Sequence, residues 1–279
     1  MPKVKIICPT CEKNGIIEVP DDKMKTNLRG LLAINIVEGI ICSHSFIAYI
    51  DKNFVIRDYF VADFNVELPE ITQFEKVQVS VPKEILNIDL IRLNITATLL
   101  TYILKSIFSK QKVVLILDQE YLYTHITNFF NYITQDTFKT DISLMTEECY
   151  KNKKKLYKDS MVFEYSKIIN NVNHLINSKK LFVEKIIVNK FLTENDLGFS
   201  YIVLKNEIQK AYELSKIIVD LINECKKKNE TINTLKISTQ LEKTYYIKIN
   251  TIYLKFLIDI VESYFGAVVP SISDSFLKI

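Results

Sequence analysis

The sequence predicts an α/β protein in which a small N-terminal β-module precedes an open, mostly parallel α/β sheet domain with long flanking helices. Three observations support this prediction. Short strand-like runs occupy the first quarter of the chain, continuous apolar runs alternate with helical patterns from Lys112 to Lys228, and apolar residues recur at helical spacing in 83–109 and 251–265. The 279 residues are 48% hydrophobic, which is ample for a core and suits two domains, or one domain with a small appendage.

Four strand-like runs build the N-terminal module. They are Val4–Ile7, Gly15–Val19, Leu31–Val37 and Phe46–Ile50. After the last run, Asp51–Asn53 forms a short polar turn, because Asp and Asn tolerate the left-handed backbone conformation. The apolar pattern resumes at Phe54, which predicts a hairpin. Its returning strand carries Arg57, Asp58 and Asp63, which are more typical of a solvated face than of a binding site.

Two pairs of potential metal ligands flank these runs. Cys8 and Cys11 are two residues apart on a turn that Pro9 suits, and Cys42 and His44 are separated by one residue, so that an extended strand would place both on one face. Structural zinc takes four thiolate and imidazole ligands in a tetrahedron. We therefore expect these four side chains to bind one structural Zn²⁺. The arrangement is zinc-ribbon-like, although C-x-H replaces the usual second C-x-x-C pair.

The alternatives to a metal site are a disulfide or unrelated buried thiols. The chain has five cysteines, and its start lacks the apolar run of a secretory signal, which we interpret as a reducing, cytoplasmic compartment where disulfides are rare. Close pairing of Cys with His in such a chain indicates zinc more often than a disulfide. Cys149 and Cys225 stand alone and are expected to be small buried hydrophobic residues.

The first quarter of the chain resembles the N-terminal zinc-binding module of uncharacterised archaeal proteins. The similarity rests on the C-P-x-C knuckle at Cys8, the C-x-H-x-F run from Cys42, and the Y-I-D-K-N-F-V-I-R turn that ends at Arg57. It implies a zinc-ribbon-like fold for this part of the chain and carries no activity.

A connector and a long helix follow the module. We divide the chain into a β-module (1–69), a connector (70–82) and an α/β domain (83–279). The connector includes a predicted strand at Phe74–Val81, and Pro82 favours the start of a helix over Lys83–Ser109. The apolar residues of this helix step alternately by four and three, as in a heptad seam. They are Leu86, Leu90, Leu93, Ala97, Leu100, Leu104 and Ile107. We favour packing within the same chain over a homodimer, because fewer than four heptads are weak evidence for a coiled coil.

The α/β domain rests on five strand-like runs. They are Val113–Leu117, Asp141–Met145, Met161–Tyr165, Leu181–Val188 and Phe199–Leu204. Helical spacing fills Glu120–Thr134 and Glu207–Lys227, and a final helix is predicted over Thr251–Phe265 with Gly266 as its C-cap. This alternation predicts a largely parallel sheet covered on both faces. We expect the final helix to pack beside Lys83–Ser109.

Polar residues follow several of these runs, at the edge of the sheet where ligands of open α/β folds bind. They are Asp118, Glu120, Glu164 and Lys205. The set resembles the site of a phospho-accepting receiver domain, but the middle strand lacks an acceptor Asp. At most a degenerate, receiver-like fold is therefore expected. The simpler interpretation of Asp118 is an N-cap of the next helix.

Several enzyme classes lack their signature in this chain. The five glycines are scattered, so neither the G-x-G-x-x-G nor the G-x-x-x-x-G-K-[ST] phosphate loop occurs. There is no G-x-S-x-G elbow and no H-E-x-x-H motif, and His125 and His174 are expected to be ordinary helix residues. The sequence also has no uninterrupted apolar stretch of about eighteen residues, so it predicts no transmembrane helix.

Two lysine runs mark the surface. Lys151–Lys158 is flanked by Tyr150 and contains Tyr157, which would suit contact with phosphates, and Lys226–Lys228 complements the dipole at a helix C-terminus. The net charge of +3 is too small to indicate nucleic-acid binding by itself. Solvated lysines are the simpler interpretation.

Three functional hypotheses follow from these residues. The favoured one is a non-enzymatic interaction or regulatory protein with a protein partner, because a closed metal site occurs without an assembled catalytic group. The second is a nucleic-acid-binding regulator that uses the zinc module and Lys151–Lys158. The third is an enzyme with Asp118, Glu120, Glu164 or Lys205 at the sheet edge, so whether the chain is an enzyme stays open.

Overall fold

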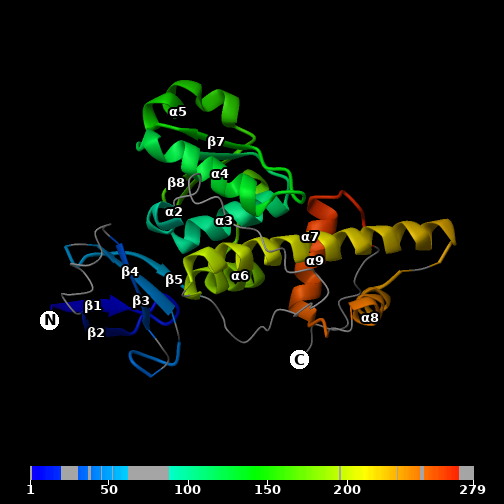
Figure 1. Cartoon of the computed structure of the whole chain (residues 1–279), viewed down its shortest axis with the longest axis horizontal. Coiled ribbons are helices and arrows are strands. Elements are labelled where there is room, and N and C mark those ends of the chain that lie inside the picture. Colours follow the sequence, from blue (N-terminus) through cyan, green and yellow to red (C-terminus); the bar gives the residue numbers. More distant parts are fainter. Residues whose placement is uncertain are drawn as a thin grey trace.

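The computed structural model of the chain describes residues 2–19, 31–36, 39–44, 46–51, 53–61, 88–194, 196–230, 232–245 and 248–269. It has the predicted α/β architecture, with two small antiparallel sheets near the N-terminus followed by a mostly parallel four-stranded sheet and its helices (Figure 1). The predictions for the connector 70–82, its strand Phe74–Val81, Asp63 and Leu86 lie outside the described residues. The division into domains stays a prediction.

The N-terminal strands agree with the sequence pattern. The first sheet pairs β1 (Lys3–Ile7) with β2 (Asn14–Glu18), and the second has the order β3 (Leu31–Ile36), β4 (Phe46–Asp51), β5 (Ile56–Phe60). All neighbouring strands in these sheets are antiparallel.

Strand β4 is buried at all six positions. Phe46, Ala48 and Ile50 pack in a small core with residues of β1 and β3, whereas Ile47 and Tyr49 belong to the main core of the chain. Successive side chains of a strand point to opposite faces, so β4 lies between two cores. The module is therefore attached to the rest of the molecule through one face of its own central strand.

The main sheet has the order β7 (Ile142–Met145), β6 (Val113–Ile116), β8 (Met161–Glu164), β9 (Lys167–Asn170). Strand β6 is parallel to both β7 and β8, as predicted. Strand β9 returns antiparallel to β8 after a two-residue turn in which Tyr165 has a φ of 51°. Strand β9 was not predicted, because its turn contains no glycine and its four residues are too few to show a period.

Helices cover both faces of this sheet, as predicted. Val113 and Leu115 point into the main core, beside α3 (Ala97–Phe108) and α4 (Tyr123–Ile133). Val114 and Ile116 point the other way, into a smaller cluster that contains Tyr150 of α5 (Glu147–Lys153). The short 3₁₀ helices are η1 (Glu120–Leu122), η2 (Lys154–Tyr157), η3 (Val172–His174) and η4 (Ser178–Lys180).

The prediction of a single helix over Lys83–Ser109 is wrong. The described part forms α2 (Ile88–Asn94) and α3, separated by Ile95 and an extended Thr96 with φ −66° and ψ 157°. The Thr96 hydroxyl accepts a 3.2 Å hydrogen bond from the Leu99 N–H and thereby caps α3. The seam residues of α3 are buried in the core of their own chain, which agrees with the favoured interpretation. They are Ala97, Leu100, Leu104 and Ile107. The homodimer stays an untested alternative.

Two predicted strands are helices instead. Leu181–Val188 lies almost entirely in α6 (Phe182–Thr193), and Phe199–Leu204 lies in the first turns of α7 (Leu197–Lys227). Helix α6 is buried on nearly all sides, so its sequence lacks the polar stripe that marks a surface helix. The fourth and fifth strands of a receiver domain are thus absent here, and the receiver-like expectation is wrong for the described residues.

The C-terminal helices pack across α7. Helix α8 is Thr234–Tyr245, and α9 is Thr251–Ser263. Figure 1 shows α9 crossing α7, and the rings of Phe256 and Phe108 lie 5.5 Å apart, so α9 also packs beside α3 as expected. The C-cap of α9 is Tyr264 and not Gly266 as predicted, although Gly266 takes a left-handed φ of +69° two residues farther on. Within the described ranges, no helix combines the length and the apolar character needed to cross a membrane.

Candidate metal centre

The first pair of ligands lies on the turn between β1 and β2. The Cys8 N–H donates to the Lys13 carbonyl at 2.8 Å, and the Glu12 N–H donates to the Cys8 carbonyl at 2.9 Å. Glu12 adopts a left-handed φ of 61°, which lets the chain reverse tightly. This turn carries Cys8 and Cys11 close together, as the C-P-T-C spacing predicted.

The second pair lies on the loop before β4. The Gly39 N–H donates to the Cys42 carbonyl at 2.8 Å, and Gly39 has a φ of +91°. Cys42 and His44 therefore occupy a loop and not the extended strand that would place them on one face. The two knuckles meet through Gly15, where a Cβ atom would lie 2.9 Å from Cγ1 of Ile41. This close approach explains a glycine inside strand β2.

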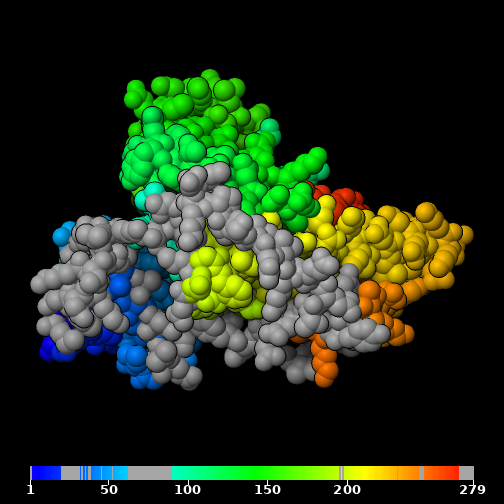
Figure 2. Space-filling view, in the orientation of Figure 1, coloured from blue at the N-terminus to red at the C-terminus, as the bar shows by residue number. Residues whose placement is uncertain are grey.

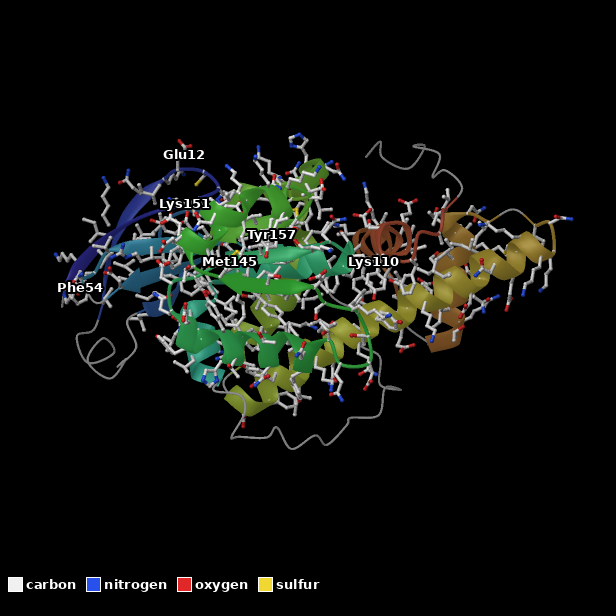
Figure 3. All side chains as sticks on the ribbon, turned by 90° about the horizontal axis from the view of Figure 1, so that it is seen from above. Glu12, Phe54, Lys110, Met145, Lys151 and Tyr157 are labelled. Atoms are coloured by element: carbon white, nitrogen blue, oxygen red, sulfur yellow. The ribbon has the colours of Figure 1, made fainter. Side chains whose placement is uncertain are left out.

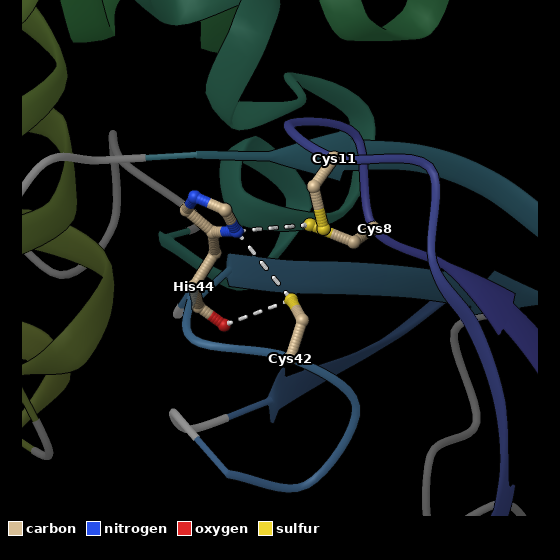
Figure 4. Close-up of side chains that lie close together, drawn as sticks. All are labelled: Cys8, Cys11, Cys42 and His44. Atoms are coloured by element: carbon tan, nitrogen blue, oxygen red, sulfur yellow. Dashed lines mark hydrogen bonds between the residues drawn. The ribbon is translucent and has the colours of Figure 1, made fainter.

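The structure brings Cys8, Cys11, Cys42 and His44 together, with their ligand atoms all within 4.8 Å of one another (Figure 4). Nδ1 of His44 lies 3.9 Å from Sγ of Cys8 and 3.5 Å from Sγ of Cys42. Tetrahedral zinc bonds of about 2.3 Å to sulfur and about 2.0 Å to nitrogen place neighbouring ligand atoms about 3.5–3.8 Å apart. The cluster thus has nearly the size of a tetrahedral metal site.

The thiols of this cluster differ in acidity. Burial alone would raise the pKa of Cys8, but the N–H groups of Cys11 and Thr10 and the neighbouring thiols outweigh it and bring the pKa to about 7. The Thr10 N–H donates to Sγ of Cys8 at 3.4 Å. Burial raises the pKa of Cys42 to about 11, and Cys8 and Cys11 add to this rise. A metal ion must therefore displace a proton from Cys42, so metal binding weakens as the pH falls.

The donor set decides what such a centre can do. Three sulfurs and one imidazole nitrogen fill all four positions of a tetrahedron, which leaves none for a substrate or a reactive water. Cys8 is buried and the other three side chains are half-buried. Among the described residues, no other group of His, Cys, Asp or Glu side chains is arranged in this way.

The polar residues predicted at the sheet edge do not form one group. Asp118 follows β6 and Glu164 ends β8, both at the carboxyl edge, and Asp118 and Glu120 are exposed. Lys205 lies on α7, where its Nζ donates to Oε1 of Gln135 at 2.9 Å. Asp118 also fails as an N-cap, because Gln119 holds that position in η1 without a side-chain hydrogen bond.

The remaining cysteines and histidines have ordinary surroundings. Cys225 is buried in the main core, and Cys149 is half-buried beside the smaller cluster on the other face of the sheet. His125 lies on α4, as predicted, whereas His174 is exposed at the end of the short η3.

A polar network at the junction of the module and the sheet was not predicted. The Ser166 hydroxyl donates to Oδ2 of Asp58 at 3.0 Å and lies 2.9 Å from the hydroxyl of Thr96. Asp58 is on β5, Ser166 is in the β8–β9 turn and Thr96 caps α3. Asp58 and Ser166 are 108 positions apart in the sequence, and nothing local in the sequence indicates their hydrogen bond.

Comparisons with protein-family models and with curated proteins find no match for this chain.

Proposed function

We propose that this chain is a non-enzymatic interaction protein whose N-terminal module is closed by a structural Zn²⁺ ion. The observation that supports the proposal is the convergence of Cys8, Cys11, Cys42 and His44 within 4.8 Å, from two knuckles that are otherwise far apart in sequence. Three thiols and an imidazole form a ligand set that suits zinc.

A structural ion would suit the size of this module. Among the described residues of the module, its small core contains eight buried hydrophobic residues, with further partly buried ones around them. Cores of this size rarely stabilise a fold alone, and structural zinc contributes folding free energy directly. The proposed role of the metal is thus to fix the outer surface of the module, which is then available to a protein partner.

The metal part of the proposal is tested by elemental analysis and limited proteolysis. We expect one zinc per chain, loss of most of it in Cys42→Ser and His44→Ala, and faster proteolysis of residues 3–60 in both variants. Cys149→Ser is the matched control, because this half-buried thiol lies outside the cluster. Full metal content with unchanged protease resistance in both variants would show that the site is wrongly assigned.

The non-enzymatic part rests on the separation of Lys205 from the acidic residues at the sheet edge. Turnover of a small molecule that disappears on substitution of Asp118 or Glu164 would contradict it. Nucleic-acid binding through Lys151–Lys158 stays the alternative function, since Lys151 and Lys153–Lys155 are exposed. Such binding would weaken steeply with salt.

A further inference from the structure

Exposed lysines precede and follow in sequence the most exposed large hydrophobic side chain in the described part of the chain. Leu156 is 76% exposed, on η2. We define the lysine face as the exposed residues Lys153, Lys154, Lys155, Leu156 and Lys158. An exposed leucine among cations suits a ligand that is both anionic and apolar.

The charges of the lysine face are not neutralised within the described residues. The adjacent Lys151 pairs with Glu147 at 2.7 Å, but the four lysines of the face have no ion pair in the parts of the chain that the structure describes. The one acidic neighbour in sequence is the exposed Asp159. The face therefore keeps a positive potential of its own, although the net charge of the chain is only +3.

The sheet extends this surface. Val162 of β8 points toward α5, whereas Phe163 and its partner Ile168 on β9 point into the main core. Lys167 and Ile169 therefore lie on the α5 side, and both are exposed. Figure 2 shows this end of the molecule as an uncovered green prominence, and Figure 3 views it from above, with Lys151 and Tyr157 labelled over the sheet.

We propose that the lysine face docks on the surface of a membrane that contains anionic lipids. Lysines near such a surface are attracted by its negative potential, each increasing binding about fivefold. Leu156 would enter the acyl boundary, where burial of a leucine favours binding by about tenfold or more. Together these contributions suit reversible, peripheral attachment without any membrane-spanning segment. This inference does not depend on a metal ion at the Cys and His cluster.

The surroundings of Tyr150 and Tyr157, the two tyrosines beside the lysine face, favour a lipid ligand over nucleic acid. Binding of single strands relies on aromatic rings that are free to stack on bases. Tyr150 is buried in the cluster beneath α5, and Tyr157 is half-buried against the same cluster. None of the three arginines of the chain, Arg29, Arg57 and Arg92, lies in the lysine face. Lysine is a point charge that suits any anion, whereas nucleic-acid recognition makes heavy use of the planar arginine fork.

The test is vesicle co-sedimentation of the full chain. Vesicles of phosphatidylcholine alone are compared with vesicles that also contain phosphatidylserine, at low and at high salt. We expect retention on the anionic vesicles only, and weaker retention at high salt. Lys154→Gln/Lys155→Gln should weaken the partitioning about 25-fold, and Leu156→Gln about tenfold. These residues are exposed, so thermal unfolding of the variants should match that of the native chain.

The second lysine run supplies a matched control. Lys226→Gln/Lys227→Gln removes the same charge from the exposed end of α7, which Figures 1 and 3 show far from α5. We expect this variant to bind vesicles within about twofold of the native chain, since the charge that it loses lies at the end of α7 that is remote from α5, and salt screens distant charges. Equal losses in both double variants would overturn the proposal in favour of unspecific charge attraction. Binding to an RNA or DNA oligonucleotide without retention on vesicles would also overturn it and support the nucleic-acid alternative.

Discussion

At the residue scale, Asp51 explains the polar turn between β4 and β5. Its Oδ1 accepts 2.9 Å hydrogen bonds from the N–H groups of Asn53 and Val55, and its Oδ2 accepts from Nε of Arg57 at 2.7 Å. The Val55 N–H holds the pKa of Asp51 below its ordinary value, and Arg57 and Asn53 add to this effect against an opposing contribution from burial. Phe54 takes a φ of 60° inside this turn.

We predict that Asp51→Asn lowers the melting temperature of the module by several degrees at neutral pH. The physical reason is that a carboxylate with a depressed pKa stabilises the fold above the ordinary Asp pKa of about 3.9 and loses this contribution as the pH falls through the lower, folded value. The gap between the native chain and the variant should therefore shrink below about pH 4. Thermal unfolding of both proteins from neutral pH down to about pH 2 measures this gap in melting temperature.

Glu18→Gln is the control for this prediction. Glu18 pairs with Lys3 at 3.9 Å, and both side chains are more than half exposed. Surface ion pairs contribute little, so this variant should change the unfolding free energy by less than about 0.5 kcal/mol. A constant gap for Asp51→Asn down to pH 2 would contradict the ionic role of Asp51.

At the element scale, α7 has the long row of buried residues at heptad spacing that was predicted for Lys83–Ser109. Eight of its buried residues step alternately by three and four along most of the helix. They are Tyr201, Leu204, Ile208, Ala211, Ser215, Ile218, Ile222 and Cys225. The first two members lie in a stretch predicted as a strand, because Phe199–Leu204 is rich in aromatic and β-branched residues. Extending the 3.5-residue period back from Glu207 would have identified the helix.

We predict that Ile218→Ala lowers the free energy of unfolding by about 2–5 kcal/mol, because it leaves a cavity in the seam. Lys216→Ala on the exposed side of the same helix is the matched control and should change it by less than about 0.5 kcal/mol. Denaturant unfolding measures both. Similar small effects for the two variants would mean that the α7 seam is not a packed core.

At the scale of the whole molecule, β4 joins the module to the main core. Its Ile47 and Tyr49 share that core with Phe60 of β5, and Asp58 is bound to Ser166 across the junction. Burial raises the pKa of the Tyr49 hydroxyl, with Asp58 adding to the rise. The Cys and His cluster instead lies beside the small core on the opposite face of β4. The two faces of one strand thus depend on different parts of the chain.

We predict that chelation of the metal produces graded loosening. Amide hydrogen exchange should accelerate most in β1 and β2, which depend on the small core, and less in β4, which is still held by its other face. Strand β6 should be unchanged. Equal protection everywhere after metal removal would contradict a structural role for the ion, and uniform loosening through β6 would contradict the separation of the two cores.

The sequence by itself determined the four Cys and His residues that come together and the strands of the module, because both follow from residue types at short spacing. It also determined β6, β7 and β8, whose continuous apolar runs are local signals. It did not determine α6 or the first turns of α7, since burial on several sides removes the polar positions from which a helical period is recognised.

Only the tertiary structure decided which residues converge and which are covered. It placed Asp58 against Ser166, buried the Tyr150 side chain of α5 against the sheet, and left Leu156 exposed among lysines. It also separated Lys205 from the sheet edge where the sequence pattern had placed it. These outcomes depend on contacts between segments distant in sequence, and burial at such contacts is set by the packing of whole elements and not by the local order of residues.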